Sequence, residues 1–145
     1  MIIDGHSHLT LPVEEHIKDM NNCGVDKTVL FSTSFHPEMA ANAQEVKASM
    51  QYLQDLLAGK KGNMTEIRKK SIEELVKAIN QYPNRYVGFG AVPPNLDLNT
   101  TEQYINNNIQ KNHLVGMGEF TLGSGQVHLL KNIFKASSEF GNLPI

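Results

Sequence analysis

Short apolar segments alternate with longer amphipathic ones along the chain, and this alternation is the feature that most limits the fold. The apolar segments, expected to form strands, cover residues 1–5, 26–34, 85–94 and 114–122. The spacing of apolar residues predicts helices over 12–24, 39–57, 65–81, 99–112 and 124–141, with Thr65 capping the third and a flexible break at 58–63. Strands separated by helices in this order pair in parallel through right-handed crossovers. The sequence therefore predicts an α/β fold.

Two parallel architectures fit this order, and the end of the first strand separates them. An open doubly wound sheet that binds nucleotides needs a glycine-rich phosphate loop after that strand, and "DGHSHL" lacks one. A closed (β/α)8 barrel, the TIM barrel, remains, although a full barrel needs about 250 residues. With 145 residues, the chain is predicted to be a single partial domain, 1–145. It would form the first half of such a barrel and end at the start of strand five in "NLPI".

Histidines and acids lie where the first and fourth strands end. His6 and His8 are two residues apart, so in an extended chain their side chains point the same way, and Asp4 shares their face. Glu119 follows the apolar start of the fourth strand, and barrel enzymes hold their sites at the carboxyl ends of strands. Imidazole and carboxylate groups on one face suit a divalent cation. The alternative is that they are ordinary polar residues at strand ends.

Other candidate residues have weaker signals. Asp4 is either an acceptor that orients a metal-binding histidine or a buried, hydrogen-bonded acid. His36, in the loop after the second strand, is a candidate substrate contact or a structural residue. His16 and His128 fall in predicted helices and are expected at the surface, as are the charges of "EIRKKSIEE" on a solvated helix face. Cys23 is the single cysteine, so it forms no internal disulfide, and we expect a buried, inert thiol.

The segments "IIDGHSHL", "GMGEFTL" and "EFGNLPI" resemble the first, fourth and approaching fifth strands of the metal-dependent amidohydrolase superfamily. The resemblance covers the first half of that superfamily's barrel. It implies one or two divalent ions at the barrel mouth, most often zinc, with manganese, magnesium or iron as alternatives. His6 and His8 would then be metal ligands, and Glu119 would stand where a supporting carboxylate stands. The superfamily's later ligands and its general base lie on strands five, six and eight, so the resemblance identifies no catalytic base here.

The resemblance implies a hydrolase in which a metal-activated water attacks an amide, ester or related bond of a small molecule. We expect this chain to be inactive by itself, because half of the barrel is missing from it. A metal-dependent decarboxylase, which is a lyase, is the nearest alternative. The other class of hypothesis is a non-catalytic half barrel that binds a ligand or a partner.

The charge and hydropathy of the chain limit the classes of partner that it can bind. The formal net charge is -2, with lysine and arginine scattered between acids, so no basic stripe suits nucleic acid. No apolar run approaches the roughly 20 residues that span a membrane, and no leader precedes the first strand, so we expect a cytoplasmic protein. A parallel half barrel exposes two strand edges. The sequence therefore predicts either a cropped product of a longer gene or a homo-oligomer in which half barrels associate through these edges.

Overall fold

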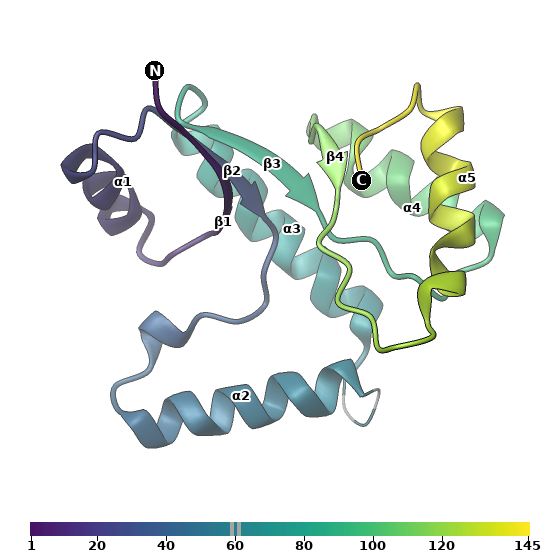
Figure 1. Cartoon of the computed structure of the whole chain (residues 1–145), viewed down its shortest axis with the longest axis horizontal. Helices are drawn as coiled ribbons and strands as arrows, with labels where there is room; N and C mark the ends of the chain where they lie inside the picture. The colour runs from purple at the N-terminus through teal and green to yellow at the C-terminus, as the bar shows by residue number, and fades with distance from the viewer. Residues whose placement is uncertain (59, 61) are drawn as a thin grey trace.

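The computed structural model describes all residues except 59 and 61, so the break expected over 58–63 lies partly outside the described residues. Four parallel strands form one sheet in the order β1-β2-β3-β4 (Figure 1). Their bounds are Ile3–His8 for β1, Lys27–Phe31 for β2, Tyr86–Gly90 for β3 and Gly116–Met117 for β4. The predicted α/β class and parallel pairing are confirmed. All the carboxyl ends of the strands therefore meet at one edge of the sheet.

Helices connect the strands, with short 3-10 turns beside several of them (Figure 1). The α-helices are α1 Val13–Asn22, α2 Ala43–Leu57, α3 Met64–Gln81, α4 Leu98–Asn108 and α5 Lys131–Glu139. The 3-10 turns are η1 Pro37–Met39, η2 Gln110–Asn112 and η3 Val127–Leu130. The helix expected over 39–57 begins only at Ala43 because Asn42 caps it, accepting hydrogen bonds from Gln44 and Glu45 N–H groups. The helix expected over 124–141 is split into η3 and α5.

The fourth strand is much shorter than the predicted 114–122. It pairs with β3 only at Gly116 and Met117. On its other side, the Met117 N–H donates to the carbonyl oxygen of Pro144 at 2.9 Å. The "NLPI" segment predicted to begin strand five therefore lies beside β4, although the structure assigns no strand to it.

The two central strands bury one face more completely than the other. Leu30 of β2 and the glycines of β3 are buried, whereas Phe31 and Phe89 on the opposite face are only partly buried. Continuous apolar sequence in β2 therefore does not mean burial on both sides here, because helices cover one face of these strands. Self-association was expected through the exposed strand edges of the half barrel, and that remains a prediction.

Glycines bring helix α3 close to the sheet. A Cβ atom added at Gly88 would lie 3.3 Å from Leu75 Cδ2 and 2.8 Å from Leu114 Cδ2, so a side chain there would displace the helix or its neighbours. The N-cap of helix α3 differs from the predicted Thr65. The Asn63 side chain, not Thr65, accepts the hydrogen bonds of the first turn, from the N–H groups of Thr65 and Glu66. Asn63 directly precedes the helix, which is the position that an N-cap requires.

Two surface expectations are wrong in opposite directions. His16 is buried, and its ring packs against Tyr86 of β3 with the ring centres 5.5 Å apart. It lies one turn before buried Met20, on the apolar face of α1. Cys23, expected to be buried, is exposed because it is the residue at which α1 ends. Among the described residues, no helix is both long and apolar enough to cross a membrane.

His16 predicts a pH dependence of stability. Burial lowers the pKa of its imidazole below the ordinary 6.5, against the opposing effect of the Asp4 and Asp19 carboxylates. Because the unfolded chain then binds this proton more readily, the free energy of unfolding falls as the pH drops below 6.5. We expect His16→Phe to flatten this fall when urea unfolding is measured between about pH 7.5 and pH 5. Parallel pH profiles of the two proteins would contradict the assignment.

Candidate metal centre

Strand β1 contains His6 and His8, and a β-bulge interrupts its pairing with β2 between Asp4 and Ser7. Asp4 lies opposite Thr28 and Ser7 opposite Leu30, so β1 contains one more residue than β2 over this stretch. The Asp4 carboxylate accepts a hydrogen bond from the His6 backbone N–H at 3.2 Å. Asp4 therefore holds the backbone of this bulge. Within the part of the chain that the structure describes, no hydrogen bond joins it to either histidine ring.

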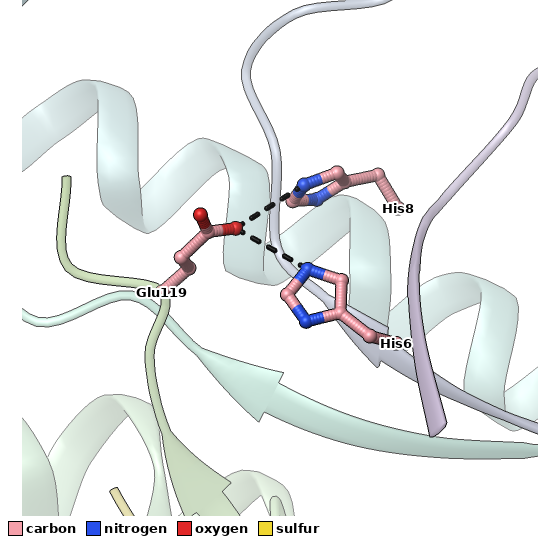
Figure 2. Close-up of side chains that lie close together, drawn as sticks. All are labelled: His6, His8 and Glu119. Atoms are coloured by element: carbon pink, nitrogen blue, oxygen red, sulfur yellow. Dashed lines mark ion pairs between the residues drawn. The ribbon is translucent and has the colours of Figure 1, made fainter. Parts of the chain in front are cut away.

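The side chains of His6, His8 and Glu119 converge on one point (Figure 2). Glu119 Oε2 lies 3.4 Å from His6 Nε2 and 3.4 Å from His8 Nε2, and all three ligand atoms lie within 4.8 Å of one another. A tetrahedral ion with bonds of about 2.0–2.2 Å separates its ligand atoms by about 3.3–3.6 Å. The two histidine–carboxylate distances fit that requirement. Two imidazoles and one carboxylate also leave a coordination position open, as catalytic zinc sites do.

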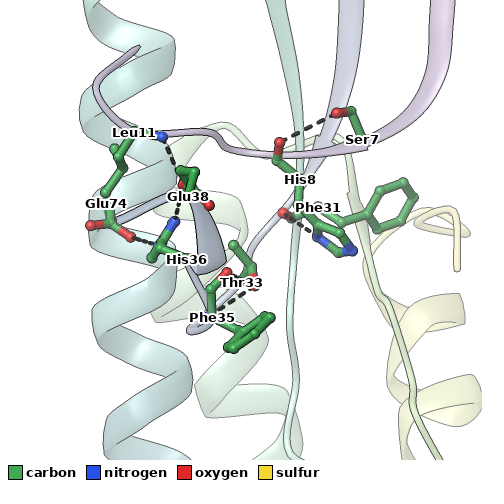
Figure 3. Close-up of polar contacts among 9 residues, drawn as sticks. All are labelled: Ser7, His8, Leu11, Phe31, Thr33, Phe35, His36, Glu38 and Glu74. Atoms are coloured by element: carbon green, nitrogen blue, oxygen red, sulfur yellow. Dashed lines mark hydrogen bonds and ion pairs between the residues drawn. The ribbon is translucent and has the colours of Figure 1, made fainter. Parts of the chain in front are cut away.

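The neighbouring strand orients the two imidazoles. His8 Nδ1 lies 3.2 Å from the carbonyl oxygen of Phe31, which only accepts hydrogen bonds (Figure 3). Nδ1 must therefore carry the proton, and this leaves the Nε2 lone pair directed toward Glu119. The Phe31 ring stacks on His6 with centres 4.3 Å apart and planes 21° apart. The sequence does not identify Phe31, because its place opposite His8 depends on the register of the two strands, which shifts between Asp4 and Ser7.

A cavity of about 430 Å³ adjoins the three side chains. His8 and Glu119 line it together with loop residues that follow β2, including Ser32 and Thr33. Helices α2 and α3 supply an apolar wall, formed by Leu53, Leu56, Leu57, Met64 and Ile67. Arg68 of α3 also lines the cavity. This corrects the expectation that the charges of "EIRKKSIEE" all lie on a solvated helix face.

His36 lies in a different position from the metal cluster. Its Nδ1 is 3.0 Å from Glu38 Oε1 and its Nε2 is 2.8 Å from Glu74 Oε2, so both ring nitrogens are engaged (Figure 3). Its side chain is 15% exposed, and it is not among the residues that line the cavity. The structure thus ties His36 into a network that joins the loop after β2 to α3.

Glu38 extends that network to the end of the first strand. Its carboxylate accepts the Leu11 N–H at 2.9 Å (Figure 3). Burial opposes ionisation of Glu38, but the hydrogen bonds from Leu11 and His36 outweigh it and hold the pKa of this carboxyl below its ordinary value. The network fixes two of the loops that border the cavity.

Neither a family model nor a curated protein sequence matches the chain. Solved structures do match. A manganese-bound 5-carboxyvanillate decarboxylase from Novosphingobium aromaticivorans superposes with a TM-score of 0.63 at 16% identity, over 97% of this chain and 49% of that one. A Staphylococcus aureus protein provisionally named an amidohydrolase gives 0.60 at 21% identity, over 95% and 44%. The 2,6-dihydroxybenzoate decarboxylase from Rhizobium gives 0.52 at 13% identity, over 94% and 47%.

This chain folds as half of the parallel α/β barrel that these solved structures share. The predicted fold and the resemblance noted in the sequence are therefore confirmed at the level of the fold. The chain spans about half the length of the solved structures that it matches. In this half barrel, the cluster of His6, His8 and Glu119 lies at the carboxyl ends of the strands, which is the end where barrel enzymes carry their chemistry.

Proposed function

We propose that this protein is a metal-dependent hydrolase of small molecules in which His6, His8 and Glu119 bind one divalent ion. The observation that supports this is the convergence of two imidazole nitrogens on a single carboxylate oxygen, each at 3.4 Å. Neutral imidazole and carboxylate ligands suit zinc, and they also suit manganese and iron. Zinc is our first choice, and the manganese in the structurally similar 5-carboxyvanillate decarboxylase makes manganese the second.

Each of the chain's own residues has a distinct role in this proposal. Glu119 offsets part of the ion's positive charge, which the neutral histidines cannot do. The Phe31 carbonyl holds the proton of His8 on Nδ1, so that Nε2 stays free to bind. When bound, the ion would supply a Lewis acid and a water acidified toward a pKa of about 7. The adjoining cavity would hold the substrate beside it.

A metal-dependent decarboxylase is the second candidate. Two structures of similar fold are decarboxylases that act on aromatic acids by name. In addition, the cationic side chain of Arg68 lines the cavity. A cation in the cavity that His8 and Glu119 also line favours a negatively charged substrate, which a decarboxylase requires.

Two successive experiments test the proposal, the first on metal binding and the second on turnover. The protein is stripped with a chelator, titrated with Zn²⁺ or Mn²⁺, and its metal content is measured by mass spectrometry. We expect close to one ion per chain. The loaded protein is then assayed against aryl esters and amides, and separately for CO₂ release from hydroxybenzoates, with the stripped protein as control. Failure to bind an ion would overturn the metal assignment. Turnover by the loaded protein would overturn the expectation that this half barrel is inactive by itself, whereas metal binding without turnover would restrict the catalytic proposal to a complete barrel.

A further inference from the structure

Arg68 is a cation that the metal cluster does not use. Its Nε atom is buried and has no hydrogen-bond partner, and its guanidinium forms no ion pair with any residue that the structure describes. Burial lowers the pKa of this group, yet an arginine remains charged at neutral pH. Arg68 is partly buried, and a charge that loses part of its hydration without gaining a partner is costly to the folded state. Such a group therefore favours binding an anion from outside the chain.

The surroundings of Arg68 define what kind of anion fits. Arg68 lines the same cavity as His8 and Glu119, and the Ser71 side chain lies one turn further along the same helix. The leucines of α2, with Met64 and Ile67 of α3, make the adjacent wall apolar. Glu38 also lines the cavity, but its carboxylate is already bonded to Leu11 and His36. The cavity volume of about 430 Å³ is in the range of small-molecule sites.

We propose that Arg68 binds the carboxylate of a small substrate whose apolar body lies against α2 and α3. The inference rests on the proposed function, because it places this substrate beside the metal cluster. The planar guanidinium presents N–H groups in a fork that matches a carboxylate. The apolar wall would contact the hydrocarbon or aromatic part of the same molecule. The substrate class is thus a small carboxylic acid, for either a hydrolase or a decarboxylase.

The test uses benzoate as the probe and benzamide as its neutral counterpart. Binding to the chelator-stripped protein is followed by NMR titration, so that a carboxylate cannot be held by a metal ion. We expect benzoate to bind the unaltered protein at least about tenfold more tightly than benzamide, as a charge-assisted hydrogen bond provides. Arg68→Gln should remove this preference, and Arg68→Lys should retain only part of it. The matched control is Lys70→Gln, which removes the same charge from an exposed position on α3 and should change nothing.

Two results would overturn the inference. One is benzoate binding no tighter than benzamide in the unaltered protein. The other is an unchanged benzoate preference in Arg68→Gln, or in Arg68→Lys if the glutamine variant does not fold. Zn²⁺ content is measured after the same stripped preparations are reloaded with Zn²⁺, and we expect Arg68→Gln to bind the ion as the unaltered protein does. Normal metal content without benzoate preference overturns only the role of Arg68, whereas benzoate preference without metal binding overturns only the proposed metal centre.

Discussion

Replacing His8 with alanine is expected to weaken Zn²⁺ binding about a hundredfold or more, since loss of even an indirect partner of a ligand costs about 10- to 100-fold in affinity. Two contacts of His8 support its role in metal binding. Its Nε2 lies 3.4 Å from Glu119, and its Nδ1 is held by the Phe31 carbonyl, so the ring is oriented before any ion arrives. Affinity is measured by competition with a chelator of known Zn²⁺ affinity.

Two further variants make this result specific. Glu119→Gln keeps the size of the side chain and removes its charge, and we expect it to weaken Zn²⁺ binding in the same direction. His128→Ala is the control, because His128 is exposed and bonds the Gly125 carbonyl away from the cluster. If His8→Ala bound Zn²⁺ as tightly as His128→Ala does, the three-residue centre would be wrong.

Replacing Leu75 with alanine is expected to lower the free energy of unfolding by about 2–5 kcal/mol. Leu75 is 1% exposed and lies in α3 where that helix approaches β3 at Gly88. The close approach leaves little room for the helix to shift into the space that alanine would create, so a cavity should remain. Urea unfolding followed by circular dichroism measures the change.

An exposed position on the same helix provides the control. Lys77→Ala removes an exposed side chain two residues further along α3, and we expect a change within about 0.5 kcal/mol. A Leu75→Ala protein as stable as Lys77→Ala would show that α3 does not anchor the sheet. Because α3 also carries Arg68, it would then give that side chain no fixed position in the cavity.

The helix ends and the environments of single side chains were the least predictable features. Thr65 and Asn63 are both good capping residues, and only the backbone shows that the helix begins after Asn63. A place in an outer helix predicts that His16 lies at the surface, but its position one turn before Met20 puts it on the inner face of that helix, against Tyr86. Local sequence lists the residues able to cap or to be buried, and it does not say which of them the neighbouring elements select.

Some residues of the candidate site could be predicted from the sequence, and others could not. His6 and His8 could be predicted as a pair because extended backbone alternates its side chains, and Glu119 because parallel strands end at one edge of a sheet. The Phe31 carbonyl could not, since it depends on the register that sets His8 opposite Phe31. The position of Arg68 in the cavity could not be predicted either. Helical periodicity does not show whether a loop and a second helix will pack around a charged side chain.

The amino-acid order is enough to predict the succession of strands and helices, their parallel pairing and the three side chains that converge at the strand ends. These follow from apolar periodicity and strand geometry, which act between residues that are neighbours in the chain or in the ladder. Three features require the packed fold. They are the Phe31 carbonyl that orients His8, the bonds of His36 to Glu38 and Glu74, and the position of Arg68 in a cavity where its Nε has no hydrogen-bond partner among the described residues. Such contacts join segments far apart in sequence, and their distances exist only after the helices have packed on the sheet.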